Sequence, residues 1–406
     1  MNRIALAMGM IWLAAGCAWL TDTDNLGKMR SETEPPVDKE DTSVVDTSIY
    51  ITALEFPITY DWRKDTLRGN VDCNLILMRN GKRKLALPVR HGMQISQDMD
   101  MHRVVGGHLY TDYSEENETI ISRDGALLFR YPGEEIILGF KVSGNYIYTL
   151  GRSRSGKGFS YRKNGKTIIE KQTGMVIGDY FNCAYPQGAL FEDMGHLYFS
   201  YQTKDVSGQT HYYLVEDGLE TPLDVPVGCD IRDVRVSEGR VCKLVSFQDQ
   251  PSRLDAIVGD TSYSIKNIGG SILNAYFFFK SDEVMILETV KLSDYGFVMM
   301  SLWDNKGRRA LYMNHSSIYA NGNQICYVGL SEGRVFEYSL PDKTVPIKDT
   351  CFLMSSRCAA YKHGHFYVAL TPADASLKPK LFIDEKSRSI DIANGFITSV
   401  SVVPEN

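Results

Sequence analysis

The 406-residue sequence lacks the residue patterns that mark several large classes of protein. None of its eight cysteines forms a Cys-x-x-Cys pair, so a structural zinc site is not expected. It contains no Gly-x-Ser-x-Gly elbow and no His-Glu-x-x-His motif, the marks of two common hydrolase classes. It has no extended cluster of lysine and arginine, and its net charge of −6 argues against nucleic-acid binding. We therefore predict no metal, no cofactor and no catalytic residue.

The sequence also lacks a long amphipathic helical pattern, and a phrase of short strands and polar turns recurs instead. The turn of this phrase is clearest in Arg79–Lys82 and Lys163–Lys166, each of which centres on Asn-Gly. Repeats of roughly 40 residues made of strands and hairpin turns are typical of a β-propeller. The apolar run that opens the phrase begins with Gly, most clearly at Gly107–Tyr110, Gly195–Tyr198 and Gly364–Tyr367.

We count eight repeats and predict an all-β propeller of eight four-stranded blades. Seven blades remain possible if the divergent fifth or sixth repeat is misread. The first repeat begins at Ile49 without an innermost strand, whereas the strand-like run Ile397–Val403 at the end of the chain has no partner. We expect this last strand to complete the first blade, because closure removes the exposed edges of an open ring.

The N-terminal segment predicts where in the cell the protein is located. Residues 1–17 combine Arg3, an apolar stretch too short to span a bilayer, and small residues before Cys17. This end resembles a bacterial lipobox, with Ala14 in place of the usual Leu, so Cys17 is the expected lipidation site. The alternative is an ordinary secretory signal that contains a cysteine. Residues 18–48 are polar and acidic, which predicts a disordered stalk. Residues 49–406 are predicted to form the propeller domain.

The remaining seven cysteines have no regular spacing. Cys73, Cys242 and Cys326 lie in apolar strand-like runs, which indicates buried small hydrophobic residues. Cys351 and Cys358 flank a loop and could pair.

Three patterns resemble functional motifs. Residues 151–158 match the phosphate-binding loop except at the last position, where Gly158 replaces Ser or Thr, and the segment after them is predicted to be a strand, whereas the motif requires a helix. We interpret this segment as a loop between strands. His108, His196 and His365 occupy one repeat position that elsewhere holds Tyr146, Arg240, Glu283 and Gln324, which indicates an exposed strand start rather than a metal site.

Carboxylate pairs could serve a glycosidase if they faced each other across a cleft. We interpret them as solvated surface. They occur at Asp98 and Asp100, at Glu115, Glu116 and Glu118, and at Asp230 and Asp233.

Aromatic and polar side chains in the longer connections are the better candidates for function, because loops on one propeller face usually carry it. Stacking rings combined with oriented hydrogen bonds suit a sugar or a peptide. The alternative is that single rings cap the blade ends as core. The candidate ligand-binding residues are Tyr60, Trp62, Arg152, Arg154, Tyr180, Tyr185, Phe247 and Tyr295.

The lipobox, the acidic stalk and the repeated Asn-Gly hairpins together resemble uncharacterised Bacteroidetes lipoproteins with propeller repeats. The resemblance implies a lipid-anchored protein of the bacterial cell envelope and no established activity. We expect a non-enzymatic module that binds a glycan, a peptide or another envelope protein. The alternative hypothesis is a glycan- or peptide-processing enzyme that uses loop carboxylates near the central channel.

Overall fold

The structure is a computed structural model. It describes residues 47–64, 71–91, 102–115, 117–154, 158–178, 188–250, 252–266, 270–280, 283–292, 297–304, 307–313, 317–321, 324–331 and 334–404. These residues form β-strands and a 3₁₀ turn at Ser356–Cys358. Within these ranges, no helix has the length and apolar character that crossing a membrane would require.

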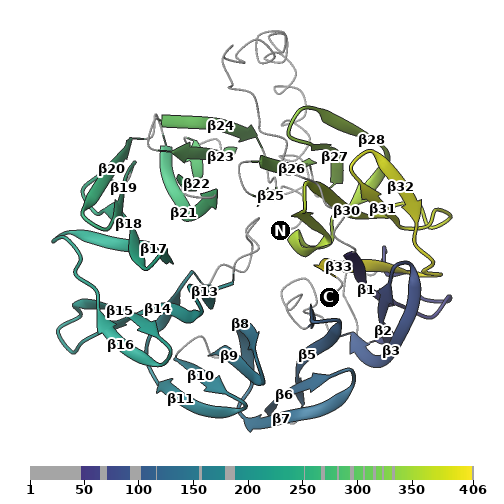
Figure 1. Ribbon diagram of the computed structural model, residues 1–406, viewed down its shortest axis with the longest axis horizontal. Helices are drawn as coiled ribbons and strands as arrows, with labels where there is room; N and C mark the ends of the chain where they lie inside the picture. The colour runs from purple at the N-terminus through teal and green to yellow at the C-terminus, as the bar shows by residue number, and fades with distance from the viewer. Residues whose placement is uncertain are drawn as a thin grey trace, which may run out of the picture. The chain divides into compact units, whose positions relative to one another are not determined.

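The strands form antiparallel sheets that follow one another around a ring (Figure 1). Most of these sheets have four strands and one has five, and one has eight because a short pairing at Cys351 and Phe352 joins two successive blades. We number these blades from one to eight in chain order. Blade one contains β1 (Thr47–Glu55), β2 (Val71–Arg79), β3 (Lys82–His91) and β33 (Gly395–Pro404). Blade two contains β4 (His102–Val105), β5 (His108–Glu115), β6 (Glu118–Arg123) and β7 (Ala126–Pro132). Blade three contains β8 (Glu135–Ser143), β9 (Tyr146–Ser153), β10 (Phe159–Lys163) and β11 (Lys166–Lys171).

The remaining blades repeat this order. Blade four contains β12 (Met175–Ile177), β13 (Phe191–Asp193), β14 (His196–Lys204), β15 (Thr210–Glu216) and β16 (Leu219–Pro222). Blade five contains β17 (Cys229–Ser237), β18 (Arg240–Phe247), β19 (Arg253–Val258) and β20 (Thr261–Lys266). Blade six contains β21 (Gly270–Lys280), β22 (Glu283–Leu292), β23 (Phe297–Asp304) and β24 (Gly307–Met313). Blade seven contains β25 (Ser317–Asn321), β26 (Gln324–Ser331), β27 (Arg334–Ser339) and β28 (Thr344–Phe352). Blade eight contains β29 (Ala359–Lys362), β30 (His365–Pro372), β31 (Lys380–Ile383) and β32 (Lys386–Ser389).

The propeller predicted from the repeats is therefore confirmed. The divergent fifth and sixth repeats each form a separate four-stranded sheet, so the eight-blade count holds over the seven-blade alternative. In blade four the innermost position is shared by two short strands, β12 and β13, which both pair with β14.

The C-terminal strand closes the ring as predicted. β33 pairs antiparallel with β1 from Thr47↔Pro404 to Glu55↔Gly395, with a bulge at Thr52 and Ala53. At this bulge the buried hydroxyl of Thr52 lies 2.8 Å from the Thr398 hydroxyl and 2.5 Å from that of Ser399. The first blade thus receives its innermost strand from the far end of the chain.

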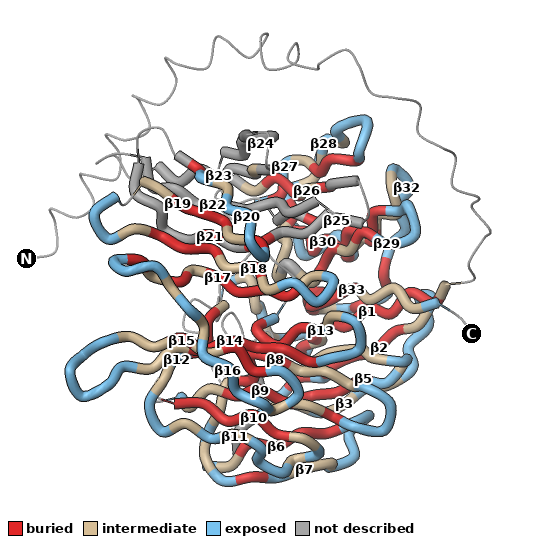
Figure 2. The backbone as a smooth tube through the Cα atoms, turned by 60° about the vertical axis from the view of Figure 1, so that its left-hand side comes forward, coloured by how far each residue is buried: buried red, intermediate tan, exposed pale blue. Residues whose placement is uncertain are grey.

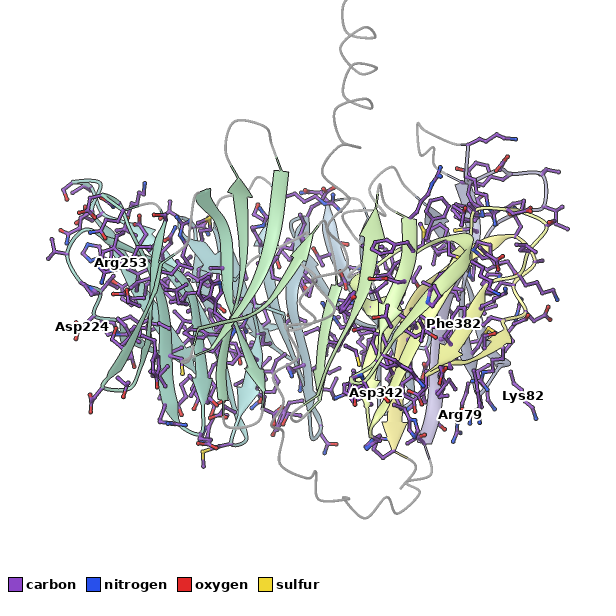
Figure 3. The ribbon with its side chains drawn as sticks, turned by 90° about the horizontal axis from the view of Figure 1, so that it is seen from above. Arg79, Lys82, Asp224, Arg253, Asp342 and Phe382 are labelled. Carbon is purple, nitrogen blue, oxygen red and sulfur yellow. The ribbon has the colours of Figure 1, made fainter. Side chains whose placement is uncertain are left out.

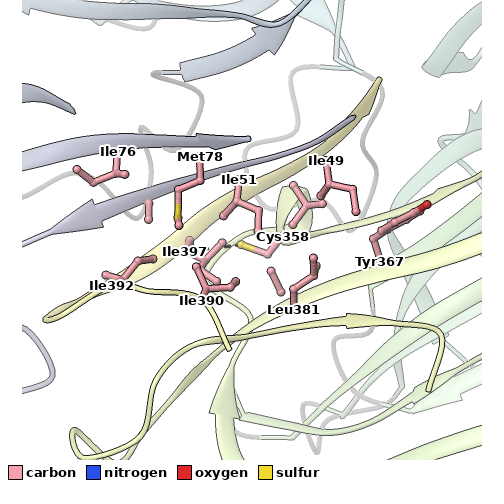
Figure 4. Close-up of a cluster of buried hydrophobic side chains, with 13 residues drawn as sticks. Ile49, Ile51, Ile76, Met78, Cys358, Tyr367, Leu381, Ile390, Ile392 and Ile397 are labelled. Carbon is pink, nitrogen blue, oxygen red and sulfur yellow. Dashed lines mark hydrogen bonds between the residues drawn. The ribbon is translucent and has the colours of Figure 1, made fainter. Parts of the chain in front are cut away.

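The hydrophobic core is divided among the interfaces between neighbouring blades. The cluster at the closure joins blade eight to blade one through residues that include Ile51, Met78, Cys358 and Ile397, and the Cys358 thiol lies 3.3 Å from the Ile397 carbonyl oxygen (Figure 4). Figure 2 shows that buried backbone follows the strands, whereas exposed backbone is concentrated at the turns. Each blade therefore buries its faces against two neighbours, as a stack of sheets requires.

The described cysteines are free and buried, as expected for Cys73, Cys242 and Cys326. Cys351 and Cys358 do not pair: both are free thiols, and they belong to different core clusters. Burial raises the pKa of the Cys351 thiol to about 11 and that of the Cys358 thiol to about 12, so both stay protonated and unreactive at neutral pH.

The recurring polar turn is explained by a pair of hydrogen bonds, which we call the clamp, between one turn residue and one residue of the second strand. In blades one, two, three, four and eight, an Asn or Asp with positive φ stands in the turn between the third and fourth strands. Its side-chain oxygen accepts a hydrogen bond of 2.8–2.9 Å from a backbone N–H of the second strand. Its own N–H donates to the carbonyl of that same residue at 2.7–2.9 Å. The clamped pairs are Asn80 with Ile49, Asp124 with Leu109, Asn164 with Ile147, Asp217 with Leu197, and Asp384 with Phe366.

The blades consequently have two unlike ends. The turn face carries the clamped turns, such as 79–82 and 163–166, together with the tight turns between first and second strands. The loop face carries the longer connections between second and third strands and between successive blades. In Figure 3, Arg79, Lys82 and Asp342 lie toward the lower edge, which is the turn face, and Arg253 lies in the upper half.

A glycine follows four of the five clamp residues, and in blades two, three and four it lies at the contact with the preceding blade. A Cβ added to Gly165 would lie 3.0 Å from the Cβ of Phe129 in blade two, and one added to Gly218 would lie 2.9 Å from Ile168 in blade three. Gly125 likewise sits against Leu87 of blade one. The outer strand of one blade therefore packs over the turn of the next. Gly81 has the same φ of +80 but meets nothing within 4 Å.

This difference gives a matched test. Gly81→Ala should lower the free energy of unfolding by about 1–2 kcal/mol, because alanine is strained at positive φ. Gly165→Ala carries the same strain at φ +74 and also presses on Phe129, so it should lose about 1–3 kcal/mol more. Urea denaturation of the two variants measures the difference. Equal losses would show that the packing of Phe129 on the turn contributes nothing.

Candidate functional site

The described ligand-binding candidates all lie on the loop face. Tyr60 and Trp62 follow β1 of blade one, Arg152 and Arg154 lie at the end of β9 in blade three, and Phe247 ends β18 in blade five. These three blades are not neighbours in the ring, so the structure does not join the candidates in one site. Tyr180, Tyr185 and Tyr295, like Cys17, lie outside the described residues. Ligand binding at these positions stays a prediction.

The aromatic segment of blade one packs against the closing strand. The Trp62 ring lies 5.0 Å from the Phe396 ring in an edge-on arrangement, and the Arg63 guanidinium stacks 4.3 Å over the indole. The Tyr60 ring lies 5.2 Å from that of Phe56. The Asn394 amide donates to the Tyr60 carbonyl at 2.8 Å. Both rings are half-buried, and these contacts favour a packing role for them.

Phe247 of blade five lies beneath a charge pair. The Arg253 guanidinium stands 4.1 Å from the ring centroid, and it forms hydrogen bonds of 3.0 and 2.7 Å with the Asp255 carboxylate. The neighbouring Asp230 accepts a hydrogen bond of 3.1 Å from the Tyr212 hydroxyl. The ring is therefore half-covered by a cation that is itself neutralised.

Residues 151–158, which resemble a phosphate-binding loop, join β9 to β10 as predicted. Close packing explains the glycine at each end of this segment. A Cβ on Gly158, which has φ +79, would lie 2.3 Å from the Lys171 carbonyl oxygen. A Cβ on Gly151 would lie 2.0 Å from a carboxylate oxygen of Glu135. These glycines therefore permit close approaches within blade three, and no helix N-terminus follows them to hold a phosphate.

A pocket of about 500 Å³ opens on the loop face between blades two and three. We call it the inter-blade pocket. It is lined from blade two by Asn117, Pro132 and Gly133, and from the start of blade three by Glu134 and Glu135. The rest of the lining is residues 153–154, 158–160, 162 and 170–172. Of the sequence candidates it contains Arg154, whereas Arg152 is not among its lining residues.

The base of the inter-blade pocket is a buried ion pair. Arg162 donates two hydrogen bonds to Glu135, at 2.6 and 2.8 Å, and both side chains are less than 10% exposed. Glu135 lies on β8 and Arg162 on β10, and the strand between them carries Gly151, whose missing side chain lets the carboxylate cross. The guanidinium also lies 4.0 Å from the Tyr131 ring centroid. Burial raises the pKa of the Tyr131 phenol, which therefore stays neutral.

The walls of the pocket carry further pairs. Arg154 Nε lies 3.3 Å from the Glu134 carboxylate, and the backbone N–H of Arg154 donates to the Glu134 carbonyl at 3.0 Å. Lys171 reaches across to Glu220 of blade four at 3.0 Å. The Gln172 amide donates to Glu170 at 2.8 Å. The pocket therefore presents donors and acceptors in neighbouring pairs, with little net charge.

Asp98, Asp100 and Glu116 lie outside the described residues, and the carboxylate candidates that the structure does describe are of two kinds. Glu118 pairs at the surface with Arg130 at 2.8 Å, as expected of a solvated group. Asp233 differs from the prediction: it is 1% exposed on β17 and accepts hydrogen bonds from the N–H groups of Val234 and Phe277, both at 2.9 Å. Its partner Arg235 donates to the Gly188 carbonyl at 3.2 Å. Burial raises the Asp233 pKa, while Arg235 opposes that rise. The pair thus ties β17 of blade five to β21 of blade six and to the connection that precedes β13 of blade four.

The three histidines stand at exposed strand starts, as predicted, and each pairs within its own blade. The Nδ1 atoms of His108, His196 and His365 lie 2.6–2.7 Å from the clamp carboxylates of Asp124, Asp217 and Asp384. The hydrogen bond to Asp217 raises the pKa of His196. Within the part of the chain that the structure describes, no group of three or more His, Cys, Asp or Glu residues is arranged to hold a metal ion.

Sequence reasoning missed the residues that build the pocket, above all Glu134, Glu135, Arg162, Lys171 and Gln172. Each looks like an ordinary surface charge or amide beside a turn. One signal was available: Gly151 lies inside a strand, where glycine often marks a close approach. The partner of that approach, Glu135, is fixed by the strand order and not by any local pattern.

Comparisons with known proteins agree on the fold. No family model matches the chain, and no curated protein matches it. Among solved structures, the dihydro-haem d1 dehydrogenase NirN is similar over 91% of this chain and 77% of its own, with 8% identity and a TM-score of 0.50. The β-propeller domain of the Trilobed protease from Pyrococcus furiosus matches over 74% of this chain and 94% of its own, with 11% identity and a TM-score of 0.43.

A prolyl endopeptidase matches at 11% identity and a TM-score of 0.41, over 77% of this chain. This chain spans about half of that endopeptidase, 52% of its length. Likeness at such low identity shows the propeller fold alone.

The buried pair predicts a stability effect that its exposed neighbour lacks. Glu135→Gln should lower the free energy of unfolding by about 3 kcal/mol, because the charge of Arg162 is left buried without a counter-charge. Glu134→Gln removes only a half-exposed partner and should cost about 0–1 kcal/mol. The double variant Glu135→Leu, Arg162→Met should recover most of the loss. Thermal or urea unfolding checks all three, and similar losses for the two single variants would contradict the assignment.

Proposed function

We propose that this protein is a non-enzymatic ligand-binding module of the bacterial cell envelope, which binds a polar ligand, a glycan or a peptide, on its loop face. The inter-blade pocket carries the proposal. Its volume of about 500 Å³ lies in the range of ligand sites, and oriented hydrogen-bonding groups from two blades converge there. The turn face offers clamped turns whose polar groups are already used.

The state of the carboxylates favours binding over catalysis. A glycosidase needs one carboxyl free to donate a proton and a second free to attack or to activate water. In the pocket, Glu135 is held by two hydrogen bonds from Arg162, and Glu134 lies against Arg154. Groups engaged in this way are better suited to orienting a ligand than to transferring protons.

The envelope location follows from the N-terminal pattern. Lipidation of Cys17 would place the chain on a membrane, with the polar residues that precede β1 as the tether, which is two residues shorter than the predicted stalk 18–48 because β1 begins at Thr47. β1 begins at Thr47, beside the clamp residue Asn80, so the chain joins the propeller on its turn face.

The anchor is tested by Cys17→Ser. In cells that process lipoproteins, the wild-type chain should fractionate with membranes, and the variant should move to the soluble fraction because it has no thiol to acylate. Metabolic labelling with an alkyne fatty acid should mark the wild-type chain alone. A variant that stays in the membrane with unchanged gel mobility would refute the anchor.

The binding function is tested with the full-length chain on arrays of oligosaccharides and peptides. We expect at least one class of ligand to be retained, and mass spectrometry should recover it unchanged after prolonged incubation. Conversion of a retained ligand to products would support the enzyme alternative instead. Failure to retain any member of either class would refute the proposed function.

A further inference from the structure

We infer that the inter-blade pocket is a binding site for a neutral saccharide. The inference rests on the proposed function, because it names the class of ligand for that binding face. Three observations on the pocket carry it: the pairing of the charges on its walls, the neutralised ion pair at its base, and the scarcity of apolar side chains along its walls.

The charges around the pocket are compensated by the protein itself. Every cation among the lining residues has a carboxylate within hydrogen-bond or ion-pair distance, so an anionic ligand would have to compete with that carboxylate. Four carboxylates in or beside the pocket would also repel it. A neutral ligand meets neither penalty. The pairs are Arg154 with Glu134, Arg162 with Glu135, and Lys171 with Glu220, and Glu170 accepts from Gln172.

Paired donors and acceptors match the hydroxyl group. A sugar hydroxyl both donates and accepts, whereas a carboxylate or phosphate only accepts and an ammonium only donates. The Gln172 amide and the Arg154–Glu134 pair place both kinds of partner side by side on the walls. Adjacent hydroxyls of a pyranose ring can therefore bind such a wall without leaving a protein group unpaired.

The base of the pocket is a neutralised ion pair. Arg162 is 6% exposed, and its two terminal nitrogens bind Glu135. The guanidinium also packs on the Tyr131 ring. A ligand that reaches the base therefore meets polar groups whose charges already cancel, which favours a neutral ligand over a charged one.

The walls are poorly suited to a peptide. Peptide recognition uses an exposed strand edge or pockets for apolar side chains. The apolar side chains of the lining are Pro132 and Phe159, and Phe159 is 3% exposed because it packs on Phe199 and Tyr201. The glycines at 133 and 158 bring backbone close to the pocket instead. A compact, hydroxyl-rich ligand fits these walls better than an apolar anchor residue.

The test uses the full-length chain and three sets of probes: neutral gluco-, manno-, galacto- and xylo-oligosaccharides, their uronate- or sulfate-bearing counterparts, and peptides. Neutral oligosaccharides should bind most tightly. Their affinity should be nearly the same in about 0.05 M and about 0.5 M NaCl, because no net charge is screened. An affinity that favours the acidic probes and falls with salt would overturn the inference.

Two variants with matched controls locate the site. Gln172→Ala should weaken the best neutral oligosaccharide about threefold to tenfold, and Arg154→Ala about tenfold, as expected for one lost hydrogen bond to a neutral or a charged group. Gln209→Ala in the exposed hairpin of blade four and Arg240→Ala on the turn face should leave affinity unchanged. Calorimetric titration and a melting curve are measured for every variant, so that a folding defect is not mistaken for lost binding.

The remaining outcomes separate the two proposals. Saccharide binding that neither pocket variant weakens overturns this assignment and leaves the proposed function standing elsewhere on the loop face. Binding of peptides without saccharides does the same. Retention of no probe at all overturns both.

Discussion

The pairing of β33 with β1 is the contact on which the rest of the ring depends. Every other blade is made from consecutive strands, whereas blade one joins the first described strand of the chain to the last. A sheet of three strands would expose the edge of β1 and part of the apolar surface that now forms the closure cluster. The hydroxyls of Thr52, Thr398 and Ser399 bind one another inside this seam, so the register is fixed by polar contacts as well as by packing. Because neighbouring blades share their cores, opening this seam would expose both blade eight and blade one.

In blades two, three and four, a two-residue turn couples local turn geometry to the contact between blades. The clamp Asn or Asp satisfies a backbone donor and an acceptor of the second strand, and the glycine after it lets the previous blade pack over the turn. Asn164 and Gly165 show both effects side by side: Asn164 holds Ile147, and Gly165 leaves room for Phe129 of blade two. The histidines that begin three of the second strands add a hydrogen bond to the same carboxylates, which explains their repetition without any metal. The repeated histidines are therefore explained by the hydrogen bonds that they form with the clamp carboxylates.

The inter-blade pocket arises where this repetition is broken. Gly151 lies inside a strand, not in a turn, and its missing Cβ lets Glu135 reach across β9 to Arg162. The resulting pair is held by two hydrogen bonds, and both side chains are nearly buried. The other charges around the cavity are paired as well, so its walls offer polarity without net charge. The same ion pair therefore contributes both to the packing of blade three and to the polarity of the proposed ligand site.

The sequence by itself determined the propeller, because hairpin turns and strands are specified by local sequence. A turn with positive φ requires residues such as Asn164 and Gly165, and a half-buried strand requires alternating apolar residues. It also determined that the last strand must find the first, since Ile397–Val403 had no other partner. It did not determine which side chains meet. Trp62 could have been either a ligand-binding ring or a cap on the core, and its edge-on contact with Phe396, more than 300 residues later, could not be read from the sequence. Asp233 looked like a solvated carboxylate, but β21 of the next blade buries it. Glu135 and Arg162 gave no signal at all. Contacts across strands and between blades depend on register and ring closure, so only the tertiary structure decided where the charges pair and where a pocket opens.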